Sequence, residues 1–140
     1  MDGYDKILDW YVAARRPFIG VSDVAQFVRP LAPGQRVLDL GCGDGIPISR
    51  LLLQNGLDLF ALDSSSRMIE RFRANFPDTP AQCARIQDSD FFNTSFDAVV
   101  AWGVFFYLAQ ADQEDAIAKV SKSLHTGGRF LFTSGRERVT

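Results

Sequence analysis

Three glycines alternate along a short stretch that follows an apolar run and an acid. Residues 37–46 read VLDLGCGDGI, in which Asp39 lies two residues before Gly41, and Gly43 and Gly45 follow at alternate positions. Glycine has no Cβ and adopts positive φ readily, so such a turn can fold tightly and let a ligand approach its backbone. The helix expected after the turn would point its free N–H groups at the same place, which favours a negatively charged group. The natural candidate is a nucleotide-like ligand.

The spacing of the glycines distinguishes two kinds of nucleotide ligand. The dinucleotide-binding fingerprint is G-x-G-x-x-G/A, whereas Gly45 comes one residue earlier than that pattern requires. Asp44 also places a carboxylate where a pyrophosphate would be repelled. S-adenosylmethionine has no phosphate; its ammonium group would be attracted to Asp39, and its carboxylate could accept hydrogen bonds from backbone N–H groups. The pattern therefore favours S-adenosylmethionine, and an NAD-dependent oxidoreductase is the less favoured alternative.

A second acid, Asp63, follows the apolar run at residues 57–62. An acid about 20 residues after such glycines is the group that binds ribose hydroxyls in dinucleotide sites. The ribose of S-adenosylmethionine makes the same demand, because one carboxylate can accept hydrogen bonds from two neighbouring hydroxyls. We therefore predict that Asp63 binds the ribose; the alternative is that it only caps the helix expected at residues 65–76.

The elements that must position these residues alternate between strands and helices. Apolar runs predict strands at residues 36–40, 57–62, 80–86, 96–102 and 129–133, and apolar periodicity predicts connecting helices at 46–55, 65–76 and 111–124. Helical crossovers imply a parallel sheet, and the nearly continuous apolar runs indicate strands that are covered on both faces. Ligands of such sheets bind beyond the carboxyl ends of the strands, where the glycine turn would lie.

Two further helices are predicted ahead of the sheet, at residues 4–15 and 22–31. We expect one domain over residues 1–140, with a helical lid or cap region at 1–34 and a Rossmann-like core at 35–140. The helical region would either cover the cofactor or simply pack on the sheet. The expected fold class is therefore α/β: an open parallel sheet with helices on both faces and with N-terminal helices.

The segment DLGCGDG at residues 39–45 resembles the glycine-rich first motif of class I S-adenosylmethionine-dependent methyltransferases. The resemblance continues along the chain: an acid ends the second strand, the polar pair Gln87 and Asp88 follows the third, and FDAVVAW forms the fourth. The segment LHTGGRFLFT is similar to the family's L-K-P-G-G turn and fifth strand, with His125 and Thr126 in place of Lys and Pro. In this order, the pieces indicate a family member with S-adenosylmethionine as its cofactor.

The resemblance implies which residues would bind the cofactor. Its methionine portion would lie against Asp39, Gly41, Cys42 and Gly43, its ribose against Asp63, its adenine against Ser64, Met68, Gln87 and Asp88, and its sulfonium beside Trp102 and Gly103. The aromatic face of Trp102 would also favour the cation. Each role has a plain structural alternative. Asp39 could brace the turn backbone, Met68 could belong to the helix core, and Asp88 could be an ordinary loop acid.

The resemblance also implies where the methyl acceptor would lie. Tyr11, Trp102, Phe106 and Tyr107 would line it, or would alternatively belong to the core. Methyl transfer from a sulfonium needs mainly positioning and the exclusion of water, so no catalytic residue is predicted. AWGV at residues 101–104 stands where many enzymes that methylate nucleobase or amide nitrogens carry Asn/Asp-Pro-Pro-Tyr/Phe. This difference favours transfer to a small-molecule acceptor.

The family's sheet usually has seven strands, whereas this sequence ends after the fifth. We therefore expect a version of the fold that is truncated after strand five, whose exposed edge could pair with a second copy to form a homodimer. A non-catalytic domain that binds S-adenosylmethionine as a partner subunit is the alternative to an active enzyme.

Composition argues against several other functions. The 140 residues carry a net charge of −2, which gives no support for nucleic-acid binding. No apolar run approaches the roughly 20 residues of a membrane span. One histidine and the distant Cys42 and Cys83 are too few soft ligands for zinc, and the two thiols suit a reducing compartment. We therefore expect a cytoplasmic protein with no metal, nucleic-acid or membrane partner.

Overall fold

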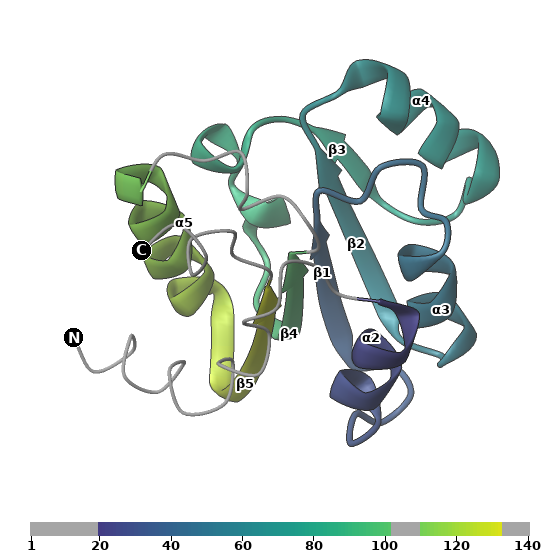
Figure 1. Ribbon diagram of the computed structural model, residues 1–140, viewed down its shortest axis with the longest axis horizontal. Coiled ribbons are helices and arrows are strands. Elements are labelled where there is room, and N and C mark those ends of the chain that lie inside the picture. The colour runs from purple at the N-terminus through teal and green to yellow at the C-terminus, as the bar shows by residue number, and fades with distance from the viewer. Residues whose placement is uncertain (1–19, 102–109, 133–140) are drawn as a thin grey trace.

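The sheet has five parallel strands in the order β3-β2-β1-β4-β5. The computed structural model describes residues 20–101 and 110–132 (Figure 1). The strands are β1 (Arg36–Leu40), β2 (Asp58–Asp63), β3 (Ala81–Cys83), β4 (Phe96–Ala101) and β5 (Leu124–Phe132). The chain runs outward from β1 to β3 and then returns to β4, so the strand order reverses between β1 and β4. Open α/β sheets bind their ligands at such a reversal.

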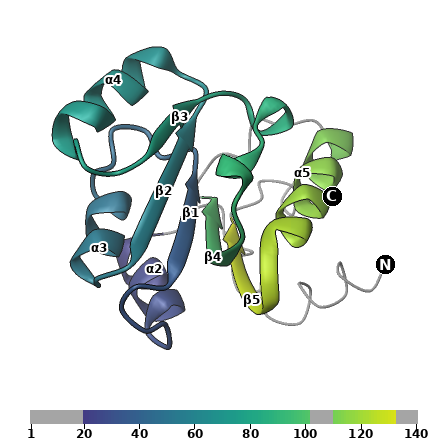
Figure 2. The same cartoon turned by 180° about the vertical axis from the view of Figure 1, so that it is seen from behind.

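Helices cover both faces of the sheet (Figures 1 and 2). The described helices are α2 (Val21–Val28), α3 (Ile48–Gln54), α4 (Ser66–Asn75) and α5 (Gln110–Ser123), with the short 3₁₀ turns η1 (Ile86–Asp88) and η2 (Phe91–Asn93) between β3 and β4. On one face, α2, α3 and α4 pack around buried side chains that include Leu52 and Phe72. On the other face, α5 and the two turns pack around Phe96 and Val120. The expected α/β class, with its open parallel sheet, is confirmed.

Strand β1 contributes side chains to both cores. Val37 belongs to the core under α2, α3 and α4, whereas Leu38 and Leu40 belong to the core under α5. Side chains of a strand alternate between the two faces of its sheet, so Asp39 lies on the same face as Val37. This alternation directs an acid into the apolar layer between the sheet and α3.

Two elements are shorter than expected, for local reasons. The helix expected from residue 46 begins at Ile48, because Ile46 precedes Pro47 and the residue before a proline avoids the helical region. The N–H of Ile46 instead donates to Asp44 Oδ1 at 3.0 Å. The strand expected at 80–86 covers only Ala81–Cys83, because its one neighbour, β2, ends at Asp63, the residue that is paired with Cys83.

Strand β5 begins earlier and is longer than expected. A turn at 126–128 followed by a strand from 129 was expected, but the strand spans Leu124–Phe132 and is irregular near its start. Phe96 of β4 pairs with Leu124 and Ala98 pairs with Arg129, so two steps along β4 match five along β5. Gly127, with φ +81°, lies in the irregular part. The expected turn is therefore a bulge within the strand.

The N-terminal region is described only from residue 20 onward. The helix expected at 22–31 spans Val21–Val28 and packs on the sheet. Arg129 of β5 donates to the carbonyl oxygen of Phe27 at 2.7 Å, and its guanidinium lies over the Phe27 ring. These contacts fasten α2 to β5, an outer strand of the described sheet. The helix expected at 4–15 lies outside the described residues, and the division of the domain into residues 1–34 and 35–140 stays a prediction.

Candidate functional site

The glycine turn leaves β1 and is tied at once to the end of β2. The N–H groups of Gly41 and Cys42 both donate to the carbonyl oxygen of Leu62, at 2.7 and 3.0 Å. Gly41, Gly43 and Gly45 have φ values of +74°, +59° and +89°, which lie in the left-handed region that glycine adopts without strain. The positive φ predicted for all three glycines is therefore present. The turn lies at the carboxyl ends of β1 and β2, as expected.

Asp63 joins this turn to the start of α4. Its Oδ2 accepts a hydrogen bond from the N–H of Gly43 at 2.9 Å, and its Oδ1 accepts one from the N–H of Ser65 at 2.8 Å. Ser65 itself caps α4, since its hydroxyl accepts from the N–H of Met68. Each carboxylate oxygen has two lone pairs, so both oxygens can still accept a hydroxyl proton. Asp63 thus has a bracing role, and its predicted contact with ribose stays a prediction.

Asp39 is buried beneath the turn. Its side chain is 1% exposed, and its Oδ2 accepts a hydrogen bond of 2.6 Å from the hydroxyl of Ser49, which is 0% exposed. The pKa of Asp39 is raised to about 7, mainly by burial; the Ser49 hydrogen bond lowers it in part, and the negative charge of Asp63 makes a smaller contribution that raises it. Within the described residues, no hydrogen bond joins Asp39 to the turn backbone and Oδ1 has no partner. The alternative that Asp39 braces the turn therefore gains no support.

Gly43 and Gly45 serve different purposes. A Cβ added at Gly45 would overlap the ring of Phe76 and lie 2.9 Å from the ring of Phe72, so this glycine lets α4 pack against the turn. A Cβ at Gly43 would meet only the sulfur of Met68, at 4.0 Å, so the surroundings of Gly43 are much less crowded than those of Gly45. At Gly45 the missing Cβ thus serves packing, and the expected approach of a ligand to the turn backbone stays a prediction.

Cys42 is a buried thiol with no sign of nucleophilic character. Burial raises its pKa, and the negative charges of Asp39, Asp63 and Asp44 raise it further. Its Sγ–H donates to the carbonyl oxygen of Gly43 at 3.4 Å. The thiol therefore stays protonated, and only a thiolate would be a competent nucleophile. The predicted contact of Cys42 with the methionine portion of the cofactor stays a prediction.

The polar pair after β3 lies in the exposed turn η1. Gln87 and Asp88 are both exposed, and Asp88 Oδ2 accepts a charged hydrogen bond of 2.8 Å from Arg85 Nε. The buried polar group here is instead Ser89, which is 3% exposed. Its hydroxyl donates to Gln82 at 2.6 Å and accepts from the N–H of Phe91 at 2.9 Å. The predicted adenine contacts of Gln87 and Asp88 stay a prediction.

The remaining predicted residues divide into two groups. Ser64 is exposed, and its carbonyl oxygen accepts from the thiol of Cys83 at 3.6 Å, whereas Met68 is half-buried beside the glycine turn. The other group lies outside the described residues and consists of Tyr11, Trp102, Gly103, Phe106 and Tyr107. The acceptor side of the site therefore stays a prediction.

Ser49 and Ser89 are buried, hydrogen-bonded serines that the sequence reasoning missed. Ser49 lies among the apolar residues of the helix expected at residues 46–55. A serine within that apolar pattern is the signal that could have identified it. No comparable signal marks Ser89, because its importance depends on Gln82 and Phe91 meeting around it.

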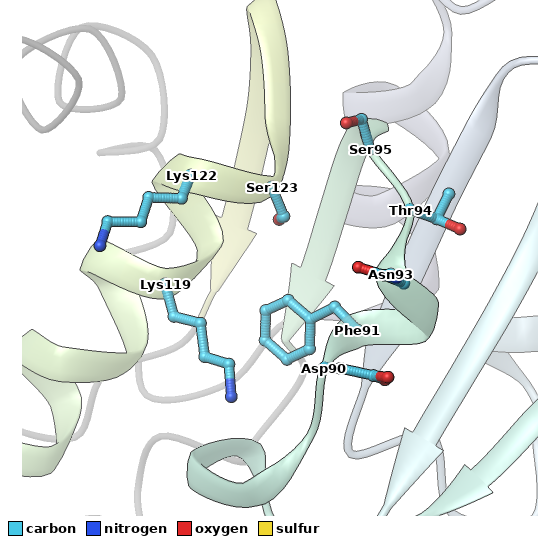
Figure 3. Close-up of a pocket in the computed structure, with 8 residues that line it drawn as sticks. All are labelled: Asp90, Phe91, Asn93, Thr94, Ser95, Lys119, Lys122 and Ser123. Atoms are coloured by element: carbon cyan, nitrogen blue, oxygen red, sulfur yellow. The ribbon is translucent and has the colours of Figure 1, made fainter.

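A separate hollow of about 310 Å³ lies between α5 and the segment that leads into β4 (Figure 3). It is lined by Asp90, Phe91, Asn93, Thr94, Ser95, Lys119, Lys122 and Ser123. The ammonium group of Lys119 is held by the carbonyl oxygen of Ile86 at 2.7 Å and lies over the ring of Phe91, while Lys122 points away from that ring in Figure 3. Ser95 precedes β4, whereas the glycine turn follows the parallel neighbour β1. The hollow therefore extends to the amino end of β4, whereas the glycine turn lies at the carboxyl ends of the strands.

Comparisons with known proteins agree on one family. Residues 37–128 match the family model of a methyltransferase domain. An uncharacterized methyltransferase of Geobacillus thermodenitrificans is 29% identical over 137 residues, which cover 94% of this chain and 61% of that protein. Among solved structures, a TehB-like SAM-dependent methyltransferase from Corynebacterium glutamicum superposes with a TM-score of 0.69 at 29% identity, over 78% of this chain and 60% of that one. SAM-bound CalS10, an amino pentose methyltransferase from Micromonospora echinaspora, superposes with a TM-score of 0.64 at 25% identity, over 79% of this chain and 46% of that one.

The parallel sheet and its glycine turn thus define a methyltransferase domain. The chain belongs to the class I S-adenosylmethionine-dependent methyltransferases, and S-adenosylmethionine is the cofactor of this family. The chain spans about 61% of the length of the Geobacillus relative.

The described residues around the turn fit this cofactor. Asp39 Oδ1 is a buried acceptor without a partner among the described residues, which suits the cationic amino group of the cofactor. A Cβ at Gly43 would meet only the end of the flexible Met68 side chain, and a methionine chain would need room at this place. The acids Asp39, Asp44 and Asp63 around the turn would disfavour a phosphate-bearing ligand.

Two features are absent from residues 20–101 and 110–132. None of the described helices is long and apolar enough to cross a membrane. In the same ranges, no group of three or more His, Cys, Asp or Glu side chains could hold a metal ion.

Proposed function

We propose that this protein transfers a methyl group from S-adenosylmethionine to a small-molecule acceptor. The observation that carries the proposal is the end of β1 with the turn that follows it. Buried Asp39 has an oxygen without a hydrogen-bond partner among the described residues, and Asp63 fixes the turn backbone at Gly43, where a Cβ would meet only Met68. The choice of a small molecule is supported by AWGV at residues 101–104 and by the similarity to CalS10, described as an amino pentose methyltransferase.

The roles of the chain's residues follow from their chemistry. When bound, the cofactor supplies a methyl group that its sulfonium already activates. Asp39 would balance the positive charge of the amino group, and Asp63 would accept hydrogen bonds from the ribose while it holds Gly43 in place. Met68, with Gln87 and Asp88, would flank the adenine. The chain's task is then to orient the acceptor and exclude water, which requires no catalytic base.

The acceptor would lie beyond the carboxyl end of β4. Trp102 and Gly103 directly follow that strand, and Phe106 and Tyr107 come soon after, so their side chains would meet at the strand-order reversal. Tyr11 would reach the same place from the N-terminal region. An aromatic lining of this kind excludes water and suits an acceptor with an apolar surface.

Calorimetric titration with S-adenosylhomocysteine and with NAD tests the cofactor assignment. We expect binding of S-adenosylhomocysteine and none of NAD; the reverse result would overturn the proposal. A methyl-labelled cofactor is then incubated with panels of small hydroxyl and amine compounds, with protein and nucleic-acid panels as controls. Labelling within the small-molecule panel supports the proposed acceptor class. Cofactor binding without labelling of any panel favours a non-catalytic domain instead.

Two finer points belong to the same proposal. The described cysteines Cys42 and Cys83 are both free thiols, which supports a location in the reducing cytoplasm. Strand β5 is the last strand of the described sheet, so a second copy could pair along its outer edge. Light scattering of the purified chain gives its mass: a homodimer supports the pairing, and a monomer at high concentration contradicts it.

A further inference from the structure

We propose that Ser49 is a positioning residue that favours the ionised form of Asp39 and fixes the orientation of its carboxylate, so that cofactor binding is coupled to the loss of one proton from Asp39. The inference rests on the proposed role of Asp39 beside the amino group of S-adenosylmethionine. It goes further because it assigns a function to a residue of α3 that would touch no ligand.

The geometry of the pair is that of a charge-assisted hydrogen bond. The Ser49 hydroxyl lies 2.6 Å from Asp39 Oδ2, within the range of about 2.5–2.7 Å that is usual for a hydroxyl on a carboxylate. Both side chains are closed off from solvent, at 0% and 1% exposure. A bond so placed fixes the rotation of the carboxylate, and it leaves Oδ1 as the oxygen without a hydrogen-bond partner among the described residues.

No other described group offsets the charge of Asp39. Its partners in the sheet are Ala61 of β2 and Val100 of β4, which carry no charge. The charged group that acts on Asp39 is another acid, Asp63 at the end of β2. The neighbouring thiol of Cys42 is likewise surrounded by acids only, since Asp39, Asp63 and Asp44 act on it. The described salt bridges, Arg36–Asp58 and Arg85–Asp88, do not involve Asp39. Ser49 is therefore the one described side chain that favours the carboxylate over the acid.

The consequence is a pH dependence of cofactor binding near neutrality. Burial raises the pKa of Asp39 to about 7, so the free protein holds a proton there in much of its population at neutral pH. A cation beside Oδ1 favours the charged form, so binding expels that proton. The affinity should then fall by up to about tenfold for each pH unit below this pKa and should level off above it.

Loss of the hydroxyl should move this dependence to higher pH. A hydrogen bond to a charged group is worth about one to two pKa units, so Ser49→Ala should raise the Asp39 pKa by about that amount. At pH near 7 the variant should bind S-adenosylhomocysteine roughly 10-fold more weakly, and most of the loss should be recovered at about pH 9. A purely structural defect would weaken binding equally at every pH.

The experiment has a readout that does not depend on the cofactor. The side-chain carboxyl carbon of Asp39 is followed by NMR through a pH titration of the free wild-type protein and of Ser49→Ala, and S-adenosylhomocysteine binding is titrated calorimetrically over the same pH range. We expect the carboxyl midpoint and the binding midpoint both to move upward in Ser49→Ala. Ser49→Thr, which keeps the hydroxyl, should restore both. In Asp39→Asn the pH dependence of binding should vanish.

Each failure has a distinct meaning. An unmoved carboxyl midpoint in Ser49→Ala overturns the positioning role. A shifted carboxyl midpoint with unshifted binding overturns the coupling, and so does a pH dependence that persists in Asp39→Asn. Absence of S-adenosylhomocysteine binding at any pH in the wild type contradicts the cofactor assignment itself, whereas the NMR result still decides what Ser49 does to Asp39.

Discussion

Replacing Asp39 with asparagine should stabilise the cofactor-free protein at alkaline pH. Burial raises the pKa of Asp39 from 3.8 to about 7, with a further contribution from the negative charge of Asp63 and partial relief from Ser49. Between these two values the folded state holds a proton that the unfolded state has released. The free energy of unfolding therefore falls as pH rises through this window, and the loss is complete above the folded-state pKa.

The size of the effect follows from the shift. One pKa unit corresponds to about 1.4 kcal/mol, so the whole shift of about three units amounts to roughly 4 kcal/mol of lost stability at alkaline pH. The part that falls between about pH 5.5 and pH 8 is about 2 kcal/mol, because only the last one and a half units lie in that interval. Asparagine keeps the shape and can accept the Ser49 hydrogen bond, but it cannot ionise.

Urea unfolding of both proteins at about pH 5.5 and about pH 8 measures this difference. The stability of Asp39→Asn relative to wild type should rise by about 2 kcal/mol between the two values. Asp78→Asn, at an exposed loop position, is the control: it shows how much the loss of one negative charge by itself changes the free energy of unfolding. If the two stability curves of wild type and Asp39→Asn run parallel, Asp39 does not bind a proton on folding, and the reasoning about its burial is refuted.

Three further substitutions test other contacts. Gly45→Ala should cost about 2 kcal/mol more unfolding free energy than Gly34→Ala, since both residues have φ +89° but only a Cβ at Gly45 overlaps aromatic rings; equal losses in thermal or urea unfolding would contradict the packing role. Asp63→Ala should weaken S-adenosylhomocysteine binding by about 1–3 kcal/mol in calorimetry at a temperature where the variant is folded, and an unchanged dissociation constant would remove Asp63 from the site. Ser89→Ala should lower the free energy of unfolding by about 1–2 kcal/mol because it leaves buried partners unsatisfied, whereas the exposed Ser95→Ala should change it by less than about 0.5 kcal/mol; similar values would contradict the bridging role.

Local sequence determines much of this fold. The strand expected at residues 36–40 is observed with the same ends, because its apolar run stops at a glycine that must turn. The strand expected at 96–102 is described as far as Ala101, and the helix expected at 111–124 spans Gln110–Ser123. Apolar runs and helical periodicity report burial directly, and burial is what separates a two-faced parallel sheet from other folds.

The features that the sequence did not predict depend on contacts between elements. The end of β3 depends on where β2 stops, and the bulge in β5 depends on its register with β4. At residues 91–93 the chain adopts three consecutive positive φ values, of 51°, 57° and 52°, in a segment with no glycine. Sequence rules assign that conformation mainly to glycine and asparagine, so two phenylalanines conceal it. Such features follow from tertiary packing, which no local pattern encodes.

The candidate site shows the same division. Asp39, the three glycines and Asp63 could be identified because their types and spacing serve a ligand. The partner of Asp39 could not, because Ser49 gains its meaning only when α3 folds back over the sheet. Likewise, Gly45 has the same backbone requirement as its neighbours, and its packing role appears only with the rings of α4 in place.

The turn is therefore fixed from two other elements before any ligand arrives. The carbonyl oxygen of Leu62 and the carboxylate of Asp63 hold its N–H groups from β2, and the ring of Phe72 packs beside Gly45 from α4. A turn ordered in advance loses little entropy on binding. Among the described residues beneath the turn, Asp39 keeps an oxygen without a hydrogen-bond partner, and its burial lowers the stability of the free protein when the carboxylate is charged. A cationic amino group at Oδ1 would offset that penalty. The free energy that the buried carboxylate costs the free protein would therefore contribute to the affinity for the cofactor. At alkaline pH the cofactor should accordingly stabilise the wild type more than Asp39→Asn, although without cofactor the variant is the more stable of the two.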